Sequence, residues 1–249
     1  MTANQKKPDL YLSMPHPCSY LPERMSTILF VDPRYSADSS FYGQCVQQGY
    51  RRSGDLIYRP YCRECTACVP VRVSVAQFTA TRGQRRVWRK NQELRVYARP
   101  PGFYPEHFEL YRRYQATRHT GSSMDDPDPE KYLAFLLSRQ VDTRFYEFRE
   151  GTAPVPVPAL NEPPAGRLLA VAVADLLPDG LSAMYTFFDP QAQARGLGVY
   201  AVLWEIEETR RLGRPYLYLG YWIRECAKMA YKRDYRPLEA LRDGRWAAL

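Results

Sequence analysis

Hydrophobic and polar positions form their clearest pattern in the last third of the chain. Residues 167–177 are almost continuously apolar and rich in valine and alanine, as expected of a strand buried on both faces. The motif PDG then turns the chain into a second apolar strand over residues 181–190. Apolar residues at helical spacing follow over residues 199–212, and residues 215–223 have the composition of a further strand. The pattern therefore predicts strand, turn, strand, glycine-bearing loop, helix and strand.

The loop of this block contains Arg195, Gly196 and Gly198 directly before the predicted helix. Backbone N–H groups at a helix N-terminus can bind a phosphate or an oxyanion. The order of elements resembles the core of the GNAT acyltransferases, in which an Arg/Gln-x-x-Gly-x-Gly/Ala loop binds the pyrophosphate of acyl-coenzyme A. Tyr200 stands where that pattern has a small residue, which favours an acyl donor other than coenzyme A. The alternative is the ordinary strand-glycine-helix corner that any α/β domain contains.

The pattern outside this block predicts shorter elements. Helices are expected over residues 41–49, 105–119 and 129–139, and strands over residues 28–30, 68–78 and 142–150. We therefore expect an α/β (α+β) protein of two domains. A Cys-containing N-terminal domain over residues 1–100 would precede a GNAT-like acyltransferase core over residues 101–249.

The segment TRGQRRVWRKNQEL is basic on one helical face, because residues three and four apart lie on the same side of a helix. No acid interrupts it before Glu93. The whole chain carries 35 Lys and Arg against 27 Asp and Glu, a net charge of +8, which suits a polyanionic partner. A phosphate-binding surface for nucleic acid is therefore expected, with a second basic segment near the C-terminus. The candidate residues are Arg82, Arg85, Arg86, Arg89, Lys90, Lys228 and Lys232.

Four cysteines in the first third of the chain have the spacing of metal ligands. CRECTAC supplies Cys62, Cys65 and Cys68, and Cys18 in the proline-bounded loop MPHPCSYLP is the best fourth ligand. Zinc or an iron–sulfur cluster uses thiolates in this way; the alternative is a group of small buried residues with weak thiols. The chain has neither a long apolar run nor an apolar signal core near residue 1, so we expect a cytoplasmic protein without a membrane partner.

Six long motifs occur in a fixed order along the chain. They are PCSYLPERMST, QGYRRSGDLIYRPYCRECTACVPVRV, RGQRRVWRKN, LYRRYQATRHTGSSMD, VADLLPDGLSAMYTFFDP and YLYLGYWIRECAKMAYKRDYRPLE. Together they resemble the aminoacyl-tRNA–protein transferases over residues 15–238, and more narrowly the bacterial branch that adds leucine to proteins beginning with Asp or Glu. The resemblance implies leucyl-tRNA as donor, such proteins as acceptors, degradation of the products by the N-end rule pathway, and no cofactor for the chemistry.

The implied reaction is aminolysis, in which a free α-amine attacks the ester carbonyl of the aminoacyl-tRNA. Asp175 matches an acidic position of the family's core motif and is expected to hold and deprotonate that amine; its alternative role is to cap the turn at LLPDG. Tyr185 is expected to orient the amine or protonate the leaving oxygen, and backbone N–H groups around Gly196 and Gly198 to bind phosphate or the oxyanion. Bidentate arginine suits an acidic acceptor. The candidates for that role are Arg72, Arg113, Arg118 and Arg195, with His119 as a second donor.

Three other functions fit parts of the pattern. An arginyl-tRNA–protein transferase would share the fold and the mechanism and differ in the donor. An acyl-coenzyme A-dependent N-acetyltransferase would need no nucleic acid and would leave the basic helix unexplained. A non-enzymatic nucleic-acid-binding protein built on a Cys-rich metal module would not need Asp175 or Tyr185.

Overall fold

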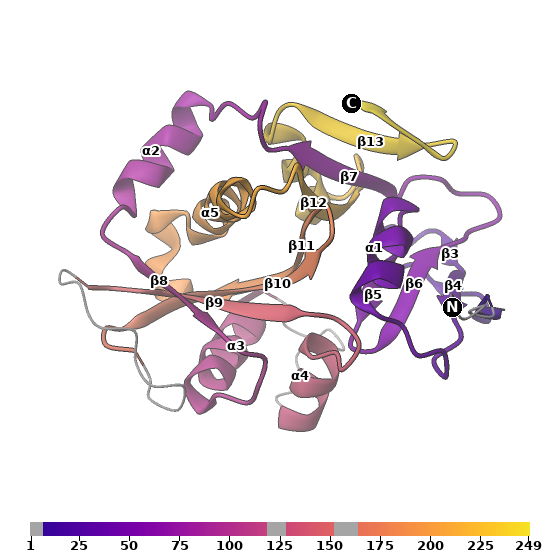
Figure 1. Cartoon of the computed structure of the whole chain (residues 1–249), viewed down its shortest axis with the longest axis horizontal. Helices are drawn as coiled ribbons and strands as arrows, with labels where there is room; N and C mark the ends of the chain where they lie inside the picture. The colour runs from indigo at the N-terminus through magenta and orange to yellow at the C-terminus, as the bar shows by residue number, and fades with distance from the viewer. Residues whose placement is uncertain (1–6, 119–127, 152–163) are drawn as a thin grey trace, which may run out of the picture.

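The computed structural model describes residues 7–118, 128–151 and 164–249 and arranges them as a mixed α/β protein around one large sheet (Figure 1). The sheet has eight strands in the order β14-β13-β7-β12-β11-β10-β9-β8. Neighbouring strands run antiparallel except β11 and β12, which run parallel. The strands are β7 (Val69–Ser74), β8 (Arg95–Arg99), β9 (Thr143–Arg149), β10 (Leu168–Leu177), β11 (Gly180–Phe188), β12 (Tyr216–Trp222), β13 (Leu238–Arg242) and β14 (Arg245–Ala248).

A smaller antiparallel sheet lies beside one end of the large sheet, at the right of Figure 1. Its order is β1-β4-β6-β5, and β2 pairs with β3 nearby. Helix α1 (Ser39–Gln47) packs between the two sheets, because its Tyr42 and Val46 share a core with Val31 of the small sheet and Tyr218 of the large one. The strands are β1 (Leu10–Leu12), β2 (His16–Pro17), β3 (Met25–Ser26), β4 (Ile28–Val31), β5 (Arg51–Ser53) and β6 (Leu56–Pro60).

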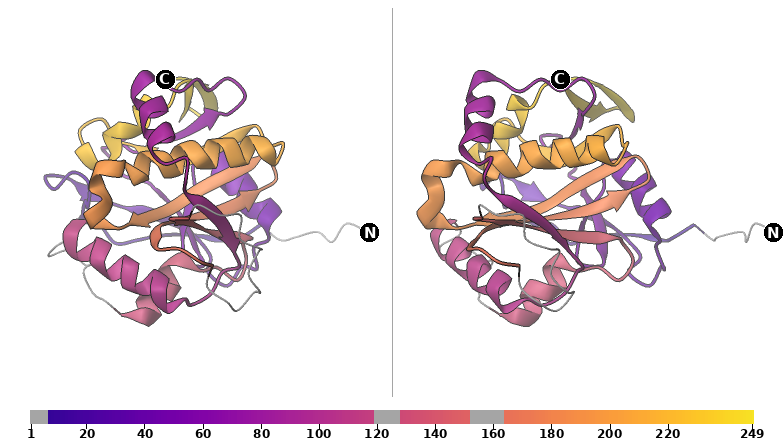
Figure 2. Two further views of the ribbon diagram at one scale, coloured as in Figure 1. Left: turned by 90° about the vertical axis from the view of Figure 1, so that its left-hand side faces the viewer. Right: turned by 60° about the vertical axis from the view of Figure 1, so that its left-hand side comes forward.

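Helices cover both faces of the large sheet (Figure 2). Helices α2 (Arg82–Lys90) and α5 (Leu197–Arg211) lie on one face, and α3 (Pro105–Arg118) and α4 (Pro129–Leu136) lie on the other. Three short segments complete the described helical elements: the 3-10 turns η1 (Pro190–Arg195) and η2 (Tyr231–Asp234), and α6 (Ala227–Ala230). The apolar faces of α5 and α3 therefore enclose the middle strands on both sides.

The strongly periodic block of the sequence forms β10, β11, α5 and β12, and this prediction is confirmed. Leu176 is half-buried, and all other residues of β10 are buried. This burial explains the almost continuous apolar run of the strand. Gly196 precedes α5 in the left-handed conformation, with φ of +67°. The predicted basic helix is also confirmed, and a capping box formed by Thr81 and Gln84 begins it.

The large sheet takes strands from both halves of the chain. β7 lies between β12 and β13, and β8 pairs with β9, so residues 69–99 belong to the same sheet as residues 143–248. Strands from both sides of residue 100 therefore meet in one sheet, and the division into two domains at that residue stays a prediction. The described strands that do not belong to the large sheet all lie within residues 10–60.

Two features of the C-terminal segment differ from the expected pattern. The basic helix expected there is only the four residues of α6, continued by the 3-10 turn η2. The chain then returns as the hairpin β13–β14, which the sequence pattern did not indicate and which completes the edge of the large sheet. Across the described ranges, no helix combines the length and the apolar character needed to cross a membrane.

Candidate active site

β11 and β12 pair over only three residues before the two strands separate. Residues 180–182 lie opposite residues 216–218, and the described ladder ends there. The register shifts between Val173 and Ala174 on one side of β11, and between Tyr218 and Gly220 on the far side of β12. Gly220 has a φ of +75°, which glycine adopts without strain. These irregularities let the strands diverge, and side chains from other elements fill the space between them, called here the strand separation.

Arg51 enters the strand separation from β5 of the small sheet. Its Nη1 donates to Ser182 Oγ at 2.7 Å, and its Nη2 donates to the carbonyl oxygen of Ala183 at 2.5 Å. A Cβ atom at Gly220 would lie 3.2 Å from Arg51 Nε, so glycine makes room for this side chain. Arg51 thus provides hydrogen bonds to β11 where its pairing with β12 has ended.

Lys232 reaches the separated part of β12 from η2. Its Nζ donates to the carbonyl oxygen of Tyr221 at 2.6 Å and lies 3.3 Å from Met229 Sδ. Burial, and then the positive charge of Arg51, lower the pKa of this lysine to about 7. The ammonium group of Lys232 is thus buried and bonded internally, so its position does not support the predicted contact with tRNA phosphates, which stays a prediction.

Glu205 belongs to α5, on the face of the sheet opposite to α1 and the small sheet. Its side chain is 0% exposed, and neither carboxyl oxygen has a hydrogen-bond partner within the described residues. Burial raises the pKa of this carboxyl to about 8, and the guanidinium of Arg51 acts in the opposite direction. A buried carboxyl group without hydrogen bonds lowers stability, so stability does not explain why a glutamate occupies this position.

Tyr185 lies on the separated part of β11, on the face covered by α3 and α4. It is half-buried, its hydroxyl donates to Gln115 Oε1 at 3.5 Å, and its ring packs edge-on against Phe135 with centroids 5.1 Å apart. The ring of Tyr114 lies 6.4 Å away. Burial raises the pKa of Tyr185 well above its usual value, so this hydroxyl keeps its proton at neutral pH.

Asp175 does not face the strand separation as a free carboxylate. Arg52 donates to it twice, from Nε at 2.8 Å and from Nη2 at 2.6 Å, and Thr143 Oγ1 donates at 3.0 Å. The side chains of Asp175 and Arg52 are both 0% exposed. This ion pair joins β10 to β5, and it leaves the expected role of Asp175 as the base without geometric support.

The arginines expected to bind the acidic acceptor divide into two groups. Arg72 is held by Glu239 at 2.7 Å and is stacked on Tyr216, so its guanidinium stabilises the β7–β13 edge. Arg195 is ion-paired with Glu93 and donates to Asn91 Oδ1 at 3.0 Å. The two arginines on α3 are more accessible: Arg113 is 44% exposed and lies 3.9 Å from Asp189, and Arg118 lies over the ring of Phe188. His119 lies outside the described residues.

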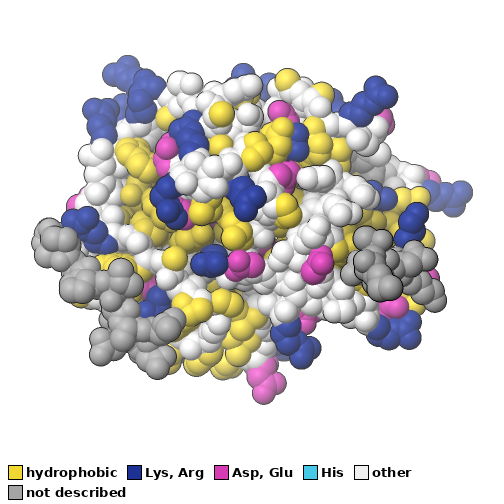
Figure 3. Space-filling model, viewed as in Figure 1, with side chains coloured by type: hydrophobic (Ala, Val, Ile, Leu, Met, Phe, Trp, Pro, Cys, Tyr) yellow, Lys and Arg dark blue, Asp and Glu magenta, His cyan; other side chains and the backbone are white. Residues whose placement is uncertain are grey.

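The basic face of α2 is exposed as expected. Arg82, Arg85, Arg86, Arg89 and Lys90 are all solvent-exposed, and Lys and Arg side chains gather over α2 at the upper left of Figure 3. Lys90 Nζ donates to the carbonyl oxygen of Ala194 at 2.5 Å, which ties α2 to the residues before Gly196. The basic helix and the glycine loop are therefore neighbours on one surface, and Lys228 is exposed on α6.

The glycine loop and Tyr200 have different environments. Gly196 begins α5, and a Cβ at Gly198 would meet the ring of Phe188 at 3.2 Å. The ring of Tyr200 points into the core, where it packs against Trp88 and Phe148. Tyr200 thus fixes α2 against α5 and does not obstruct the loop. Its size therefore does not act at the loop, where the sequence analysis expected it to disfavour coenzyme A.

The thiols of the predicted metal site lie near one another. Cys18, Cys62, Cys65 and Cys68 are all half-buried, and Arg24 Nη1 donates to Cys65 Sγ at 3.1 Å. Burial, then the neighbouring Cys18, Cys62, Cys65 and Cys226, raise the pKa of Cys68 to about 12. In the part of the chain that is described, no three His, Cys, Asp or Glu side chains are arranged to hold a metal ion. Metal binding by these cysteines stays a prediction.

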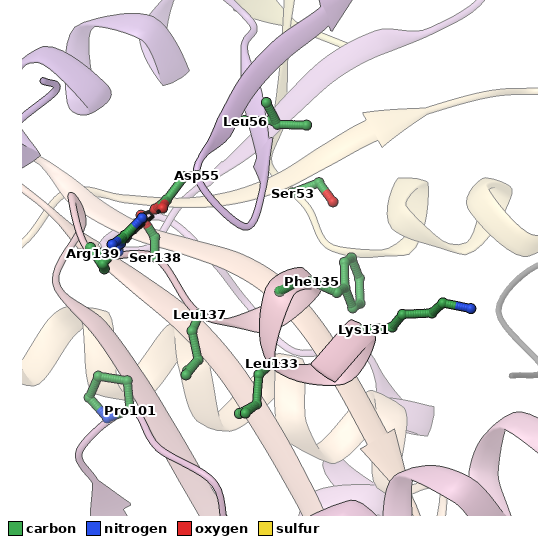
Figure 4. A pocket seen from close by; sticks show the side chains of 11 residues that line it. Ser53, Asp55, Leu56, Pro101, Lys131, Leu133, Phe135, Leu137, Ser138 and Arg139 are labelled. Atoms are coloured by element: carbon green, nitrogen blue, oxygen red, sulfur yellow. Dashed lines mark hydrogen bonds and ion pairs between the residues drawn. The ribbon is translucent and has the colours of Figure 1, made fainter. Parts of the chain in front are cut away.

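A pocket of about 880 Å³ lies between the β5–β6 hairpin and α4 (Figure 4). Ser53, Asp55 and Leu56 form the hairpin side, and Leu133 and Phe135 belong to the helix side. None of the predicted site residues lines this pocket, although Phe135, which does, also packs against Tyr185.

Arg51 and Glu205 are ionisable residues of this region that the sequence interpretation did not single out. Glu205 carried a detectable signal, because it falls four residues after Ala201 on the apolar side of the predicted helix. Gly220 carried another, since a glycine inside an apolar strand indicates a bulge or a close approach. Arg51 carried none, because its partners lie 131 and 132 residues further along the chain.

Comparison with known proteins gives matches over nearly the whole chain. Models of the arginine-tRNA-protein transferase N terminus and C terminus match residues 16–86 and 106–242. The aspartate/glutamate leucyltransferase of Nitrosococcus oceani is 49% identical over 241 residues, which are 97% of this chain and 96% of that protein. The enzymes of that name from Pseudomonas fluorescens and Pseudomonas aeruginosa are 48% and 47% identical, each covering 96% of both chains. Among solved structures, L-PGS from Bacillus licheniformis matches with a TM-score of 0.45 and 13% identity, over 63% of this chain and 47% of that one.

The C-terminal family model alone spans residues 106–242, more than half of the 249 residues, and the named relatives align from end to end. The chain therefore belongs to the arginine-tRNA-protein transferase family, in the branch of the aspartate/glutamate leucyltransferases.

Proposed function

We propose that this protein transfers leucine from leucyl-tRNA to the α-amine of proteins that begin with Asp or Glu, which marks them for degradation by the N-end rule pathway. The sequence identity of 47–49% over nearly the whole chain to proteins named for this activity carries the proposal. A cytoplasmic location is part of it, because charged tRNA and newly exposed protein N-termini occur together there.

The exposed basic face of α2 supports tRNA as the donor. Five cationic side chains there can neutralise backbone phosphates, and the neighbouring loop at Gly196 offers backbone N–H groups to the acceptor stem. The parallel pair β11–β12, its separation and the helix that follows fit a GNAT-like acyltransferase core. In that arrangement the aminoacyl end of the tRNA would reach the strand separation.

The chemistry needs no cofactor, because an aminoacyl ester is already activated. The neutral α-amine attacks the ester carbonyl, an oxyanion forms, and its collapse expels the ribose hydroxyl. Tyr185 holds a protonated hydroxyl on the separated part of β11, where it is suited to hydrogen-bond the oxyanion or the leaving oxygen. Asp175 is not part of this proposal, since Arg52 and Thr143 occupy its carboxylate.

Arg113 and Arg118 remain candidates for contacts with the acceptor protein. Both belong to the last turns of α3, next to the aromatic side chains that surround Tyr185. Arg72 and Arg195 are less suited, because acidic side chains of the protein already bind them.

A transfer assay tests the proposal. Labelled leucine or arginine, each charged on its tRNA, is offered with peptides that begin with Asp, Glu, Ala or Lys. Leucine is expected on the Asp and Glu peptides only. The name of the matching family model favours arginine as the second candidate donor, so transfer of arginine alone would replace the donor and keep the mechanism. Transfer of neither amino acid would overturn the proposal, and activity with acetyl-coenzyme A would then identify an N-acetyltransferase.

A further inference from the structure

The pocket between the β5–β6 hairpin and α4, called here the hairpin pocket, has walls that are tied together by hydrogen bonds. The backbone N–H of Gly54 donates to the carbonyl oxygen of Phe135 at 2.8 Å. Asp55 Oδ1 accepts hydrogen bonds from Ser138 Oγ at 2.8 Å and from the backbone N–H of Arg139 at 3.0 Å. These bonds fix the turn of the hairpin against the end of α4 and the residues after it. The pocket is therefore formed before a ligand enters it.

The lining of the hairpin pocket combines apolar side chains with a few charged ones. Leu56 is 41% exposed although it is a large apolar side chain, and Phe135 below it in Figure 4 is half-buried. The charged members are Asp55, which is bonded as described, and the exposed Lys131 and Arg139. Exposed apolar side chains around a concave surface indicate a binding site. An apolar side chain on a polar main chain fits this lining better than the phosphate-rich end of a tRNA does.

Strand β5 connects the hairpin pocket to the strand separation. Arg51 and Ser53 lie on the same side of β5, because side chains two residues apart in a strand point the same way. Both are half-buried, whereas Arg52 between them is buried. Arg51 donates to Ser182 Oγ at 2.7 Å and to the carbonyl oxygen of Ala183 at 2.5 Å in the strand separation, and Ser53 lines the pocket. The pocket therefore adjoins the strand separation along this side of β5.

Phe135 provides a second connection, to Tyr185. Its side chain lines the hairpin pocket, and its ring packs edge-on against the ring of Tyr185 with centroids 5.1 Å apart. Tyr185 carries the hydroxyl that is suited to bond the oxyanion or the leaving oxygen. An extended chain advances about 3.3 Å per residue. An acceptor whose N-terminal residue reacts beside Tyr185 would therefore bring its second and third residues to the pocket.

The volume of the hairpin pocket distinguishes between possible occupants. It measures about 880 Å³, and pockets of about 300–1,000 Å³ enclose drug-sized molecules. The single side chain of a leucyl group would leave most of this volume empty. A few residues of a polypeptide would fill it, so the volume favours the acceptor over the amino acid of the donor.

We propose that the hairpin pocket binds the second and third residues of the acceptor protein and favours apolar side chains at these positions. The proposal rests on the function proposed above and adds to it a preference beyond the N-terminal Asp or Glu. Leu56 is then a specificity residue that contacts the acceptor away from the reacting atoms. Such a contact is the same before and during the reaction, so it lowers the KM for the acceptor and leaves kcat unchanged.

Transfer kinetics with the tetrapeptides Asp-Leu-Leu-Gly and Asp-Gly-Gly-Gly test the proposal. With leucyl-tRNA as donor, the wild-type protein should have a KM about tenfold lower for Asp-Leu-Leu-Gly at a similar kcat, because apolar side chains are buried on binding. Leu56→Ser should raise the KM for Asp-Leu-Leu-Gly about fivefold. The same variant should leave the KM values for Asp-Gly-Gly-Gly and for leucyl-tRNA unchanged.

Leu10→Ser is the matched control. Leu10 is 51% exposed and belongs to β1, at the opposite edge of the small sheet from β5. This variant should keep wild-type kinetic constants for both tetrapeptides, and thermal unfolding should show that both variants remain folded. Equal KM values for the two tetrapeptides in the wild-type protein would overturn the proposal. An unchanged KM for Asp-Leu-Leu-Gly in Leu56→Ser, or an equal rise for both tetrapeptides, would overturn it as well.

Photo-cross-linking separates this proposal from the function itself, because it needs no donor tRNA. Asp-Leu-Leu-Gly with a diazirine in both leucine side chains is irradiated with the wild-type protein, and mass spectrometry locates the labelled residues. Labels are expected on lining residues such as Leu56 and Leu133, and excess unlabelled peptide should remove them. Transfer of an amino acid other than leucine would change the donor and leave this pattern as it is. Labels confined to other surfaces would overturn the proposal even where leucine transfer is observed.

Discussion

Arg52 and Asp175 form a buried ion pair that joins two strands 123 residues apart in the chain. Asp175 lies near the end of the nearly continuous apolar strand β10, shortly before a turn, a position at which an acid suggests either catalysis or a cap. The structure supports neither of these two roles, since the partners of Asp175 are an arginine of the small sheet and a threonine of β9. Its substitution should therefore affect folding before it affects catalysis.

Asp175→Asn is expected to destabilise the protein by about 3–5 kcal/mol, because it leaves the guanidinium of Arg52 buried and unpaired. Urea denaturation followed by circular dichroism measures this change. The double variant Arg52→Leu/Asp175→Leu should lose less stability than the single variant, since it buries no unpaired charge. A stable but inactive Asp175→Asn would contradict this and return Asp175 to a direct role in the reaction.

Replacing Arg82, Arg85 and Arg86 by glutamine should weaken the binding of tRNA. These side chains are exposed on α2, and each phosphate contact that is lost should reduce the slope of log affinity against log salt by about 0.7–0.9. Filter binding over a series of salt concentrations measures the slope. Arg139→Gln is the matched control, because that side chain is 94% exposed but lies beside the pocket at α4. Equal slopes for the triple variant and the wild type would exclude α2 from the tRNA interface.

Tyr185→Phe removes one hydroxyl and leaves the ring contacts with Phe135 and Tyr114 in place. We expect kcat to fall by about 10–100-fold, because a hydrogen bond to developing charge is lost, with little change in thermal stability. Tyr132→Phe serves as the control, since the hydroxyl of Tyr132 is buried without a partner among the described residues. If both variants turned over at the wild-type rate, the hydroxyl of Tyr185 would have no part in the chemistry.

The stability of the protein should depend on the ionisation of Glu205. Its pKa of about 8 lies above the usual value of 4.5, so the folded state binds more protons than the unfolded state between these values. Stability from this group is greatest at low pH and falls as the pH rises toward 8. Glu205→Gln should therefore stabilise the protein more at pH 8 than at pH 5, by on the order of 3 kcal/mol.

The burial of Lys232 makes stability rise with pH, opposite to the effect of Glu205, and it does so at higher pH values. Its pKa of about 7 lies below the usual 10.5, so the cost of burying its charge is present at low pH and disappears as the pH rises above 7. Comparing Glu205→Gln with wild type at each pH cancels this contribution. A stability difference that does not vary with pH would show that Glu205 is not buried as an acid.

The cysteines test whether a metal belongs to this fold. If Cys18, Cys62, Cys65 and Cys68 are ligands, purified protein should contain about one equivalent of zinc or iron, and Cys65→Ser should lower it. Cys45→Ser is the control, because Cys45 belongs to α1 and packs in the core. Metal-free protein that is folded and active would end the prediction and leave these thiols as part of the packing around Cys68.

The sequence predicted the centre of the fold better than its active site. β10, β11, α5 and β12 follow from local periodicity, which depends only on neighbours in the chain. The hairpin β13–β14 was missed because its strands mix charged and apolar residues at a sheet edge. The burial of Lys232 was missed for a related reason: a lysine within a basic segment looks exposed until the strand that accepts its hydrogen bond is known.

Arg51 shows most directly what a local sequence pattern cannot predict. Nothing in RRSGD distinguishes Arg51, which donates to Ser182 and Ala183 of β11, from Arg52, which binds Asp175. The two side chains alternate across β5 and therefore reach different partners. Their roles depend on strands that follow more than 120 residues later, so no local pattern could assign them.

The position of β7 between β12 and β13 also determines when the protein can fold during its synthesis. β7 ends at Ser74, whereas its two neighbours end at Trp222 and Arg242. A ribosome must therefore make most of the chain before this apolar strand has either of its partners. The nascent polypeptide carries an unpaired strand through most of translation, which makes it a candidate for protection by chaperones until the last strands emerge.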